Sequence, residues 1–335
     1  RYRSSAASDV YKRQGLENLR TVDGVFFLGT NEVLEDISAL SNLTSVAEDI
    51  QISSNADLVD LSGISSLAEL GGDLVIEENS DLISLTGLEG LTAVGGGVYI
   101  QNNDALTDLT GLDNVASIGS ALSLEDNTNL ESLTGLDSLT SIGDNLTLDN
   151  NDAISTLSGL DALTEVGEKV NIAEMELLGD LSGLESLATI GGGLTLERNP
   201  SLTDLSAIAG VSVGESLKID ENETLASISG LSGITVGENL RVENNGRLAN
   251  LDGLESVTSI EGDLLIDNND VLTSVSGLSG LTHVGGDFDI GYCDALTTMS
   301  GLEALEEVAG SLAINAVPGF SLSLIHISEP TRRYE

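Results

Sequence analysis

Acidic side chains recur at one position of a repeat that is 23 or 24 residues long, and they are the first candidates for chemistry. The series consists of Glu77, Glu125, Asp149, Glu197, Asp220, Glu243 and Asp267. If successive repeats stack as turns about 4.8 Å apart, the last four residues form a continuous row of carboxylates. Calcium accepts sites made only of oxygen ligands, and paired carboxylates can cleave polysaccharides.

Neither chemistry is supported by the surrounding motifs. The sequence has no EF-hand loop and no calcium-binding nonapeptide, so we favour a hydrated acidic face and keep a Ca²⁺ site at Glu197, Asp220, Glu243 and Asp267 as a minority hypothesis. A sugar-cleaving site also needs loops that leave the repeat and basic residues that stabilise charge. The units here differ in length by only one residue, and few basic residues lie among them. No Gly-x-Ser-x-Gly elbow, phosphate loop or zinc-ligand spacing occurs. The sequence therefore predicts no enzyme and no other cofactor, with a polysaccharide-active β-helix enzyme as a distant alternative.

Composition limits the partners and the core. The 335 residues carry 55 Asp and Glu against 12 Lys and Arg, a formal net charge of −43, so the surface repels nucleic acid and anionic membranes. Apolar residues make up 40% and aromatic residues only 3%, which predicts a core of Leu, Ile, Val and Ala. No apolar run is long enough to cross a bilayer, and the single cysteine, Cys293, cannot form an intramolecular disulfide.

The elements that position the carboxylates come from a repeat. The shared pattern is G-L-x-x-L-T-x-[VI]-G-x-x-L-x-[LI]-x-x-N-x-x-L-x-x-[LI]-[ST], and Leu146-Thr147-Leu148 alternates as a short strand with inward leucines. The units begin at Gly15, Ala39, Gly63, Gly87, Gly111, Gly135, Gly159, Gly183, Ala207, Gly230, Gly253, Gly277 and Gly301. Helical spacing is absent from every unit. We predict an all-β parallel solenoid of about twelve to thirteen coils, as one domain over 15–321 with a truncated last coil.

One column of asparagines is predicted to hold the coils together. Stacked coils would form an Asn ladder whose amides satisfy backbone groups at a corner. Its members are Asn31, Asn55, Asn79, Asn103, Asn127, Asn151, Asn199, Asn222, Asn245 and Asn269. Met175 and Cys293 interrupt the ladder and are predicted to fill the space as apolar side chains. A Gly-Gly pair after the Val/Ile position is expected to supply turn backbone, including positive φ.

A second column varies from unit to unit and is predicted to face outward. It includes Val75, Tyr99, Ser123, Thr147, Asn171, Thr195, Lys218 and Arg241. The inward columns are nearly constant, so a partner would bind on this variable face. The candidate binding residues are Phe27, Tyr99, Lys218 and Arg241.

The two ends of the chain differ from the repeat. DNA that encodes Asp9–Gln14 can encode Leu322–Ile327 on its opposite strand, with all six residues matching. The longer stretches Ser4–Gln14 and Leu322–Arg332 resemble translations of adapters used to prepare sequencing libraries. We therefore interpret 1–14 and 322–335 as non-native tails. They contain six of the 12 bases and three of the 55 acids, which leaves 52 acids and six bases between them.

The repeat resembles that of the receptor L-domain family, which is related to leucine-rich repeats. The motif is carried by "GLESLATIGGGLTLERNPSLTDLS" (Gly183–Ser206) and its copies over Gly15 to about Ile314. The resemblance implies a right-handed β-helix at the cell surface or outside the cell that binds proteins or glycans without catalysis. The first hypothesis is thus an adhesion or binding module, with a bacterial surface array as its setting. The alternative is a structural spacer that presents another domain.

Overall fold

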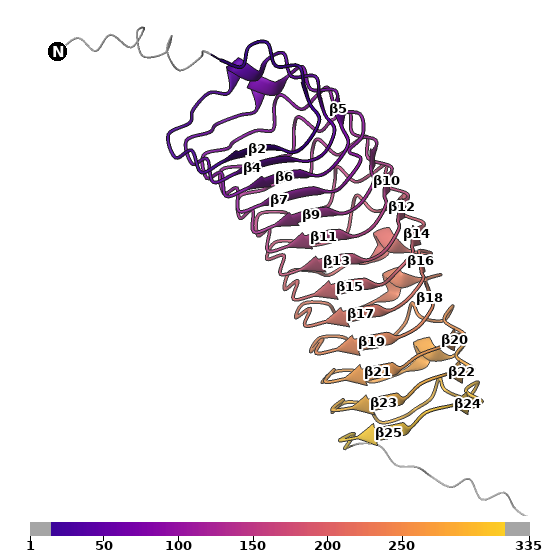
Figure 1. The fold of residues 1–335 in the computed structure, drawn as a ribbon. Helices are drawn as coiled ribbons and strands as arrows, with labels where there is room; N and C mark the ends of the chain where they lie inside the picture. Colours follow the sequence, from indigo (N-terminus) through magenta and orange to yellow (C-terminus); the bar gives the residue numbers. More distant parts are fainter. Residues whose placement is uncertain (1–14, 319–335) are drawn as a thin grey trace, which may run out of the picture.

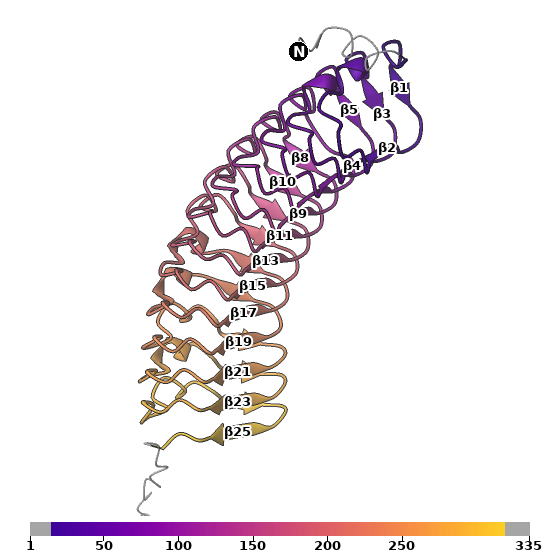
Figure 2. The same ribbon diagram turned by 90° about the vertical axis from the view of Figure 1, so that its left-hand side faces the viewer.

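The protein is a curved rod of stacked coils, in which the long parallel sheet runs the whole length (Figure 1; Figure 2). The computed structural model describes residues 15–318; both predicted tails, and 319–321 of the predicted domain, lie outside this range. One 13-stranded sheet has every strand parallel to its neighbours. At about 4.8 Å between strands, it is about 60 Å long. The prediction of an all-β parallel solenoid is confirmed.

Each coil contributes one four-residue strand to the 13-stranded sheet. The strands are β2 (Phe26–Gly29), β4 (Ile50–Ser53), β6 (Leu74–Glu77), β7 (Val98–Gln101), β9 (Leu122–Glu125), β11 (Leu146–Asp149), β13 (Val170–Ala173), β15 (Leu194–Glu197), β17 (Leu217–Asp220), β19 (Leu240–Glu243), β21 (Leu264–Asp267), β23 (Phe288–Gly291) and β25 (Leu312–Asn315). Most have alternating buried and half-buried residues, as expected for a strand with one face on the core.

A second side of the rod consists of two-residue strands. They form one six-stranded sheet and two three-stranded sheets. The strands are β1 (Thr21–Val22), β3 (Ser45–Val46), β5 (Glu69–Leu70), β8 (Ser117–Ile118), β10 (Ser141–Ile142), β12 (Glu165–Val166), β14 (Thr189–Ile190), β16 (Ser212–Val213), β18 (Thr235–Val236), β20 (Ser259–Ile260), β22 (His283–Val284) and β24 (Glu307–Val308).

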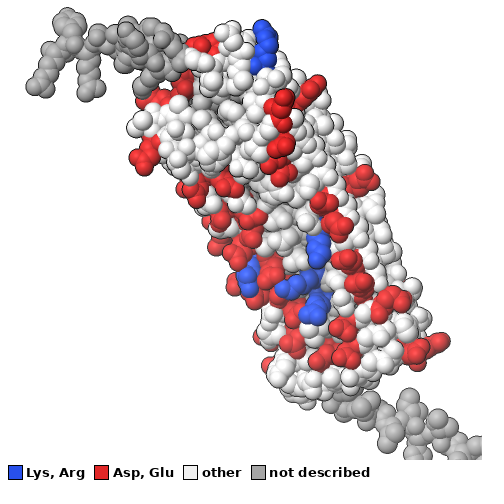
Figure 3. Space-filling model, viewed as in Figure 1, with Lys and Arg blue, Asp and Glu red and all other residues white. Residues whose placement is uncertain are grey.

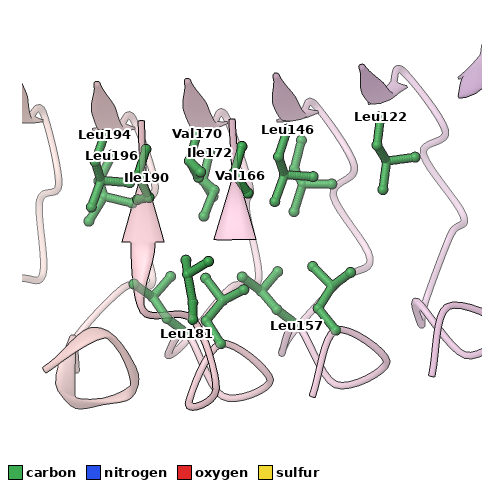
Figure 4. Packing of buried hydrophobic residues seen from close by; sticks show 14 of the residues in the cluster. Leu122, Leu146, Leu157, Val166, Val170, Ile172, Leu181, Ile190, Leu194 and Leu196 are labelled. Carbon is green, nitrogen blue, oxygen red and sulfur yellow. The ribbon is translucent and has the colours of Figure 1, made fainter. Parts of the chain in front are cut away.

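Helical structure within the described residues is limited to short 3-10 turns on the third side. They are η1 (Ser38–Leu40), η2 (Ser62–Ile64), η3 (Ser206–Ile208), η4 (Ser229–Leu231) and η5 (Ser276–Leu278). The three sides enclose stacked aliphatic side chains such as Leu146, Leu157 and Val166, which point toward one another (Figure 4). Burial of these side chains is the main stabilising contribution to the stack.

Glycine is needed at two different positions of the repeat. At one it allows adjacent coils to approach closely, and at the other it adopts a positive φ. Gly143 follows the Val/Ile position, where a Cβ atom would overlap the carbonyl oxygen of Gly119 on the preceding coil. The Gly-Gly positions were expected to supply positive φ, and this expectation is wrong. Positive φ occurs instead at the glycine that opens many units, such as Gly111 (φ 121°), and at the residue before each ladder position, such as Asn102 (φ 54°). The close stacking of coils, and not the turn, excludes a side chain at Gly143.

The Asn column lies at the corner after each long strand. The backbone N–H of Asn79 donates to Oδ1 of Asn103 (3.1 Å), and the Asn79 side-chain amide donates to the carbonyl oxygens of Ile52 and Glu77 (both 2.9 Å). The same bonds recur along the stack, and the members from Asn55 to Asn269 are fully buried, whereas Asn31 on the first coil is exposed. Each amide thus connects adjacent coils and satisfies buried backbone groups.

Candidate functional site

Two columns of side chains cover the outer face of the 13-stranded sheet. The central column consists of Phe27, Gln51, Val75, Tyr99, Ser123, Thr147, Asn171, Thr195, Lys218, Arg241, Leu265, Asp289 and Ala313, which pair in register. The carboxylate column lies two residues further along each strand. It consists of Gly29, Ser53, Glu77, Gln101, Glu125, Asp149, Ala173, Glu197, Asp220, Glu243, Asp267, Gly291 and Asn315.

The four consecutive acids of the carboxylate column lie side by side, but cations are built into the row. Glu197 pairs with Asp220, Asp220 with Glu243, and Glu243 with Asp267. The Lys218 ammonium lies 2.7 Å from a Glu197 oxygen and 2.9 Å from an Asp220 oxygen. Repulsion within the row is therefore partly relieved by the protein itself.

Asp220 is the most enclosed carboxylate of this row, since only 6% of the residue is exposed. It accepts hydrogen bonds from Lys218 and from the side-chain amide of Asn244 (2.7 Å). Burial acts to lower the pKa of Lys218, but its hydrogen bonds to Glu197 and Asp220 outweigh this and raise the pKa. Lys218 thus stays charged and holds two neighbouring strands together.

Arg198 forms a second bridge beside Lys218. It occupies the positive-φ corner and contacts Glu174 (3.1 Å), Glu197 (3.2 Å) and Glu221 (2.9 Å), which belong to three successive coils. The side chain is half exposed, so its pairs are screened by solvent. Figure 3 shows Lys and Arg side chains gathered over the part of this face around β13 to β19.

Burial, with the charges of neighbouring carboxylates, raises the pKa of three carboxyl groups in the carboxylate column. Burial, followed by the charges of Glu174 and Glu125, raises the pKa of Asp149. Burial and then the charge of Asp220 raise the pKa of Glu243, and burial followed by Asp289 does the same for Asp267. Burial and neighbouring carboxylates thus outweigh the opposing charges of Arg198 at Asp149 and of Arg241 and Lys218 at Glu243.

The four candidate binding residues fall into two separate places. Lys218 and Arg241 are register neighbours on β17 and β19, and Arg241 is exposed. Phe27 and Tyr99 lie on β2 and β7, with Gln51 and Val75 between them. The structure thus brings Lys218 and Arg241 together, whereas Phe27 and Tyr99 are three strands apart and far from that pair.

Four further residues lie in distinct environments at outward, ladder and short-strand positions. Ser123 belongs to the outward column, but only 5% of it is exposed, and its hydroxyl bonds to Glu125. Met175 and Cys293 are fully buried at ladder positions, and burial raises the pKa of the Cys293 thiol. His283, on β22, lies 3.4 Å from Glu307. Cys293 therefore packs as a small core side chain instead of presenting a reactive thiolate.

Many acids accept backbone hydrogen bonds, which the repeat pattern did not lead us to predict. The carboxylate two residues after the opening glycine binds that glycine's N–H: Asp113 binds Gly111, and Glu185 binds Gly183, both at 2.8 Å. The carboxylate of Asp73 accepts the N–H of Gly97 on the next coil (2.6 Å). The recurrence of Asp or Glu after "Gly-Leu" was the available signal. Much of the net charge thus belongs to coil corners.

The remaining possibilities for ions and membranes are limited within the described part of the chain. Among residues 15–318, no group of three or more His, Cys, Asp and Glu side chains is arranged to hold a metal ion. The Ca²⁺ hypothesis therefore has no preformed site there. None of the helices in this range could span a membrane.

The chain is similar to an internalin from Listeria monocytogenes, with 18% sequence identity and a TM-score of 0.47, over 86% of this chain and 86% of that chain. No protein-family model matches the chain, and no curated protein matches it either.

Proposed function

We propose that this chain is a non-catalytic repeat module that binds a protein or glycan partner at the cell surface or outside the cell. The observation that carries the proposal is the difference between the columns of the 13-stranded sheet. The inward positions of adjacent strands are occupied by Leu, Ile, Val or Phe throughout, whereas the central column changes in size or polarity at most strands and includes the charged residues Lys218, Arg241 and Asp289. The core needs regular packing, and the outer face is free to differ.

The shape of this face also suits binding. Thirteen strands present a continuous, open surface, and its Lys and Arg side chains gather over one part of it (Figure 3). Phe27 is 60% exposed, and Arg241 is exposed on β19. Aromatic and arginine side chains are the types enriched at binding hot spots.

A spacer that presents another domain is the second candidate function. It is favoured by the uniform coils, because parallel pairing continues from β2 to β25 and gives a rod about 60 Å long. A spacer needs no partner on its faces. The two functions therefore differ in whether saturable binding occurs.

The test measures saturable binding of the labelled full chain to intact cells and to arrays of extracellular proteins and glycans. Adhesion predicts binding that weakens when Phe27 and Arg241 are changed to Ala. The matched control is Leu177→Ala, which removes an apolar side chain that is 58% exposed and lies outside the sheet. Binding that is absent, or equally weakened by the control, favours the spacer.

A further inference from the structure

The N-terminal part of the sheet face holds two aromatic rings that lean along their strands. Phe27, Gln51, Val75 and Tyr99 occupy adjacent central-column positions on β2, β4, β6 and β7. We name these four residues the platform. The Tyr99 ring lies over Gly97, where a Cβ atom would be 2.6 Å from Tyr99 Cε2. Phe27 leans over Gly29, where a Cβ atom would overlap the ring.

Each ring thus depends on a glycine two residues away in the sequence. This is Gly29 for Phe27 and Gly97 for Tyr99. On the two strands between them, the positions equivalent to Gly97 hold Asp49 and Asp73, and those equivalent to Gly29 hold Ser53 and Glu77. Side chains there would meet a leaning ring. The glycines therefore let each ring lie low over the sheet, with its outer side toward solvent.

The platform differs in charge from the rest of the face. Between Arg20 and Lys169 the sequence has no Lys or Arg. The carboxylates of Asp49 and Asp73 accept backbone N–H groups of Asp73 (2.9 Å) and Gly97 (2.6 Å). The half-buried amides of Gln51 and Gln101 lie on the same outer face. Figure 3 shows a largely uncharged area over the N-terminal strands of this face.

We infer that the platform binds a neutral polysaccharide or oligosaccharide, an inference that rests on the proposed binding function and names its ligand class. The C–H groups of a sugar ring carry slight positive charge and stack on the negative face of an aromatic ring. Sugar hydroxyls can exchange hydrogen bonds with the amides of Gln51 and Gln101. An acidic sugar would find no cation here and would be repelled by the neighbouring carboxylates.

The distance between the rings sets the ligand length. They are three strands apart, about 14 Å, and lean in opposite directions over positions four residues apart along the strand, about 13 Å. The diagonal between them is roughly 20 Å. Only a chain of several sugars reaches both. A protein partner would instead need a pocket for an anchoring side chain, and these low rings provide a flat surface.

The test is affinity electrophoresis of the full chain in gels that contain a soluble neutral β-glucan, a neutral mannan or polygalacturonate. We expect at least one neutral polymer to retard the protein and polygalacturonate to leave it unretarded. Phe27→Ala and Tyr99→Ala should each weaken binding about tenfold, and Tyr99→Phe should retain it. Leu265→Ala, in the same column on β21, is the matched control.

Gly29→Ala is a second probe, since it keeps both rings but displaces that of Phe27, and it should weaken binding of the same polymer. Thermal melts check that each variant folds. Retardation by no neutral polymer, or retardation unchanged by the ring variants, overturns the inference. If cells are still bound through Arg241, the proposed function survives while this ligand class is rejected. If neither assay shows saturable binding, both are rejected.

Discussion

The platform on β2 to β7 and the charged segment on β13 to β21 are built on the same backbone but use their outer side chains differently. On the platform, Phe27 and Tyr99 lean over glycines and make few charged contacts. In the charged segment, Lys218 and Arg198 connect carboxylates of neighbouring coils. The same sheet positions thus offer exposed apolar groups in one region and internally paired charges in the other.

The difference shows that a charged group on this face is not automatically available to a ligand. Lys218 is only partly exposed, and two carboxylates already hold its ammonium. A ligand that bound Lys218 would have to replace its ion pairs with Glu197 and Asp220 and would itself lose water on binding. Phe27 makes no such demand, because 60% of it is already exposed. The apolar end is therefore better prepared for binding.

The largest expected effect tests whether the Asn ladder contributes equally to stability beside the platform and beside the charged segment. Asn79 follows β6 of the platform, and Asn245 follows β19 of the charged segment. Replacing either residue with Leu removes amide bonds to two carbonyl oxygens and to the N–H of an adjacent coil. Each replacement should lower the free energy of unfolding by about 1–3 kcal/mol, measured by urea denaturation. Costs that differ by more than about 1 kcal/mol would show that the surface difference extends into the core.

The next effect separates the two regions at the surface. Lys218→Met leaves the enclosed Asp220 and its neighbour Glu197 without their shared cation and should lower stability by about 1–2 kcal/mol. Gln51→Met, at the same column position on β4, should change it by about 0.5 kcal/mol or less. Adding Asp220→Asn to Lys218→Met should recover part of the loss. An equal effect of the two single changes contradicts the comparison.

Sodium chloride should raise stability where neighbouring carboxylates repel one another and the built-in cations do not fully balance them. Asp149 lies among Glu125, Asp126 and Glu174, whose charges raise its pKa after burial has done so. Asp149→Asn should therefore raise stability at low salt by about 0.5 kcal/mol or less, and sodium chloride should narrow the gap. Thermal melts over a salt series measure this. Calcium at equal ionic strength should act no more strongly than sodium, since a larger effect would indicate a specific site.

The sequence predicted what depends on period alone. The positions of Leu146 and Leu148, the Asn ladder and the alignment of Glu197 with Asp220 all follow from counting residues within one repeat. The reach of a side chain does not follow from counting. Lys218 turns toward Asp220 and Glu197, and Tyr99 leans over Gly97, because rotamers respond to neighbours on adjacent coils.

The backbone at the corners was also beyond the sequence pattern. Positive φ recurs at the residue before each ladder position, which is Asn102 on one coil, Arg198 on another and Tyr292 on a third. No single residue type marks the position, although asparagine tolerates this conformation better than most residues other than glycine. The stacked ladder imposes it, so the local sequence gives little sign of it.

The smallest expected effect is a pH dependence that originates in the carboxylate column. The raised pKa values of Asp149, Glu243 and Asp267 mean that the folded protein holds these protons more tightly than the unfolded chain. Their destabilising contribution is fully present at pH 7, and it disappears as the pH falls through the folded pKa values toward the ordinary ones. Stability should therefore rise slightly on mild acidification, by about 0.5 kcal/mol or less per site because solvent screens these groups.

The opposite sign applies at the coil corners. Hydrogen bonds from glycine N–H groups lower the pKa of Glu17 and Glu303, so their stabilising contribution is lost only as the pH falls below the ordinary range for glutamate. Denaturation at a series of pH values should thus show a shallow maximum on the acid side of neutrality. Glu243→Gln with Asp267→Asn should flatten the rise, whereas Gln51→Met, on the platform, should leave it unchanged because neither side chain titrates. A profile that falls steadily from pH 7 would mean that the corner acids outweigh the acidic row.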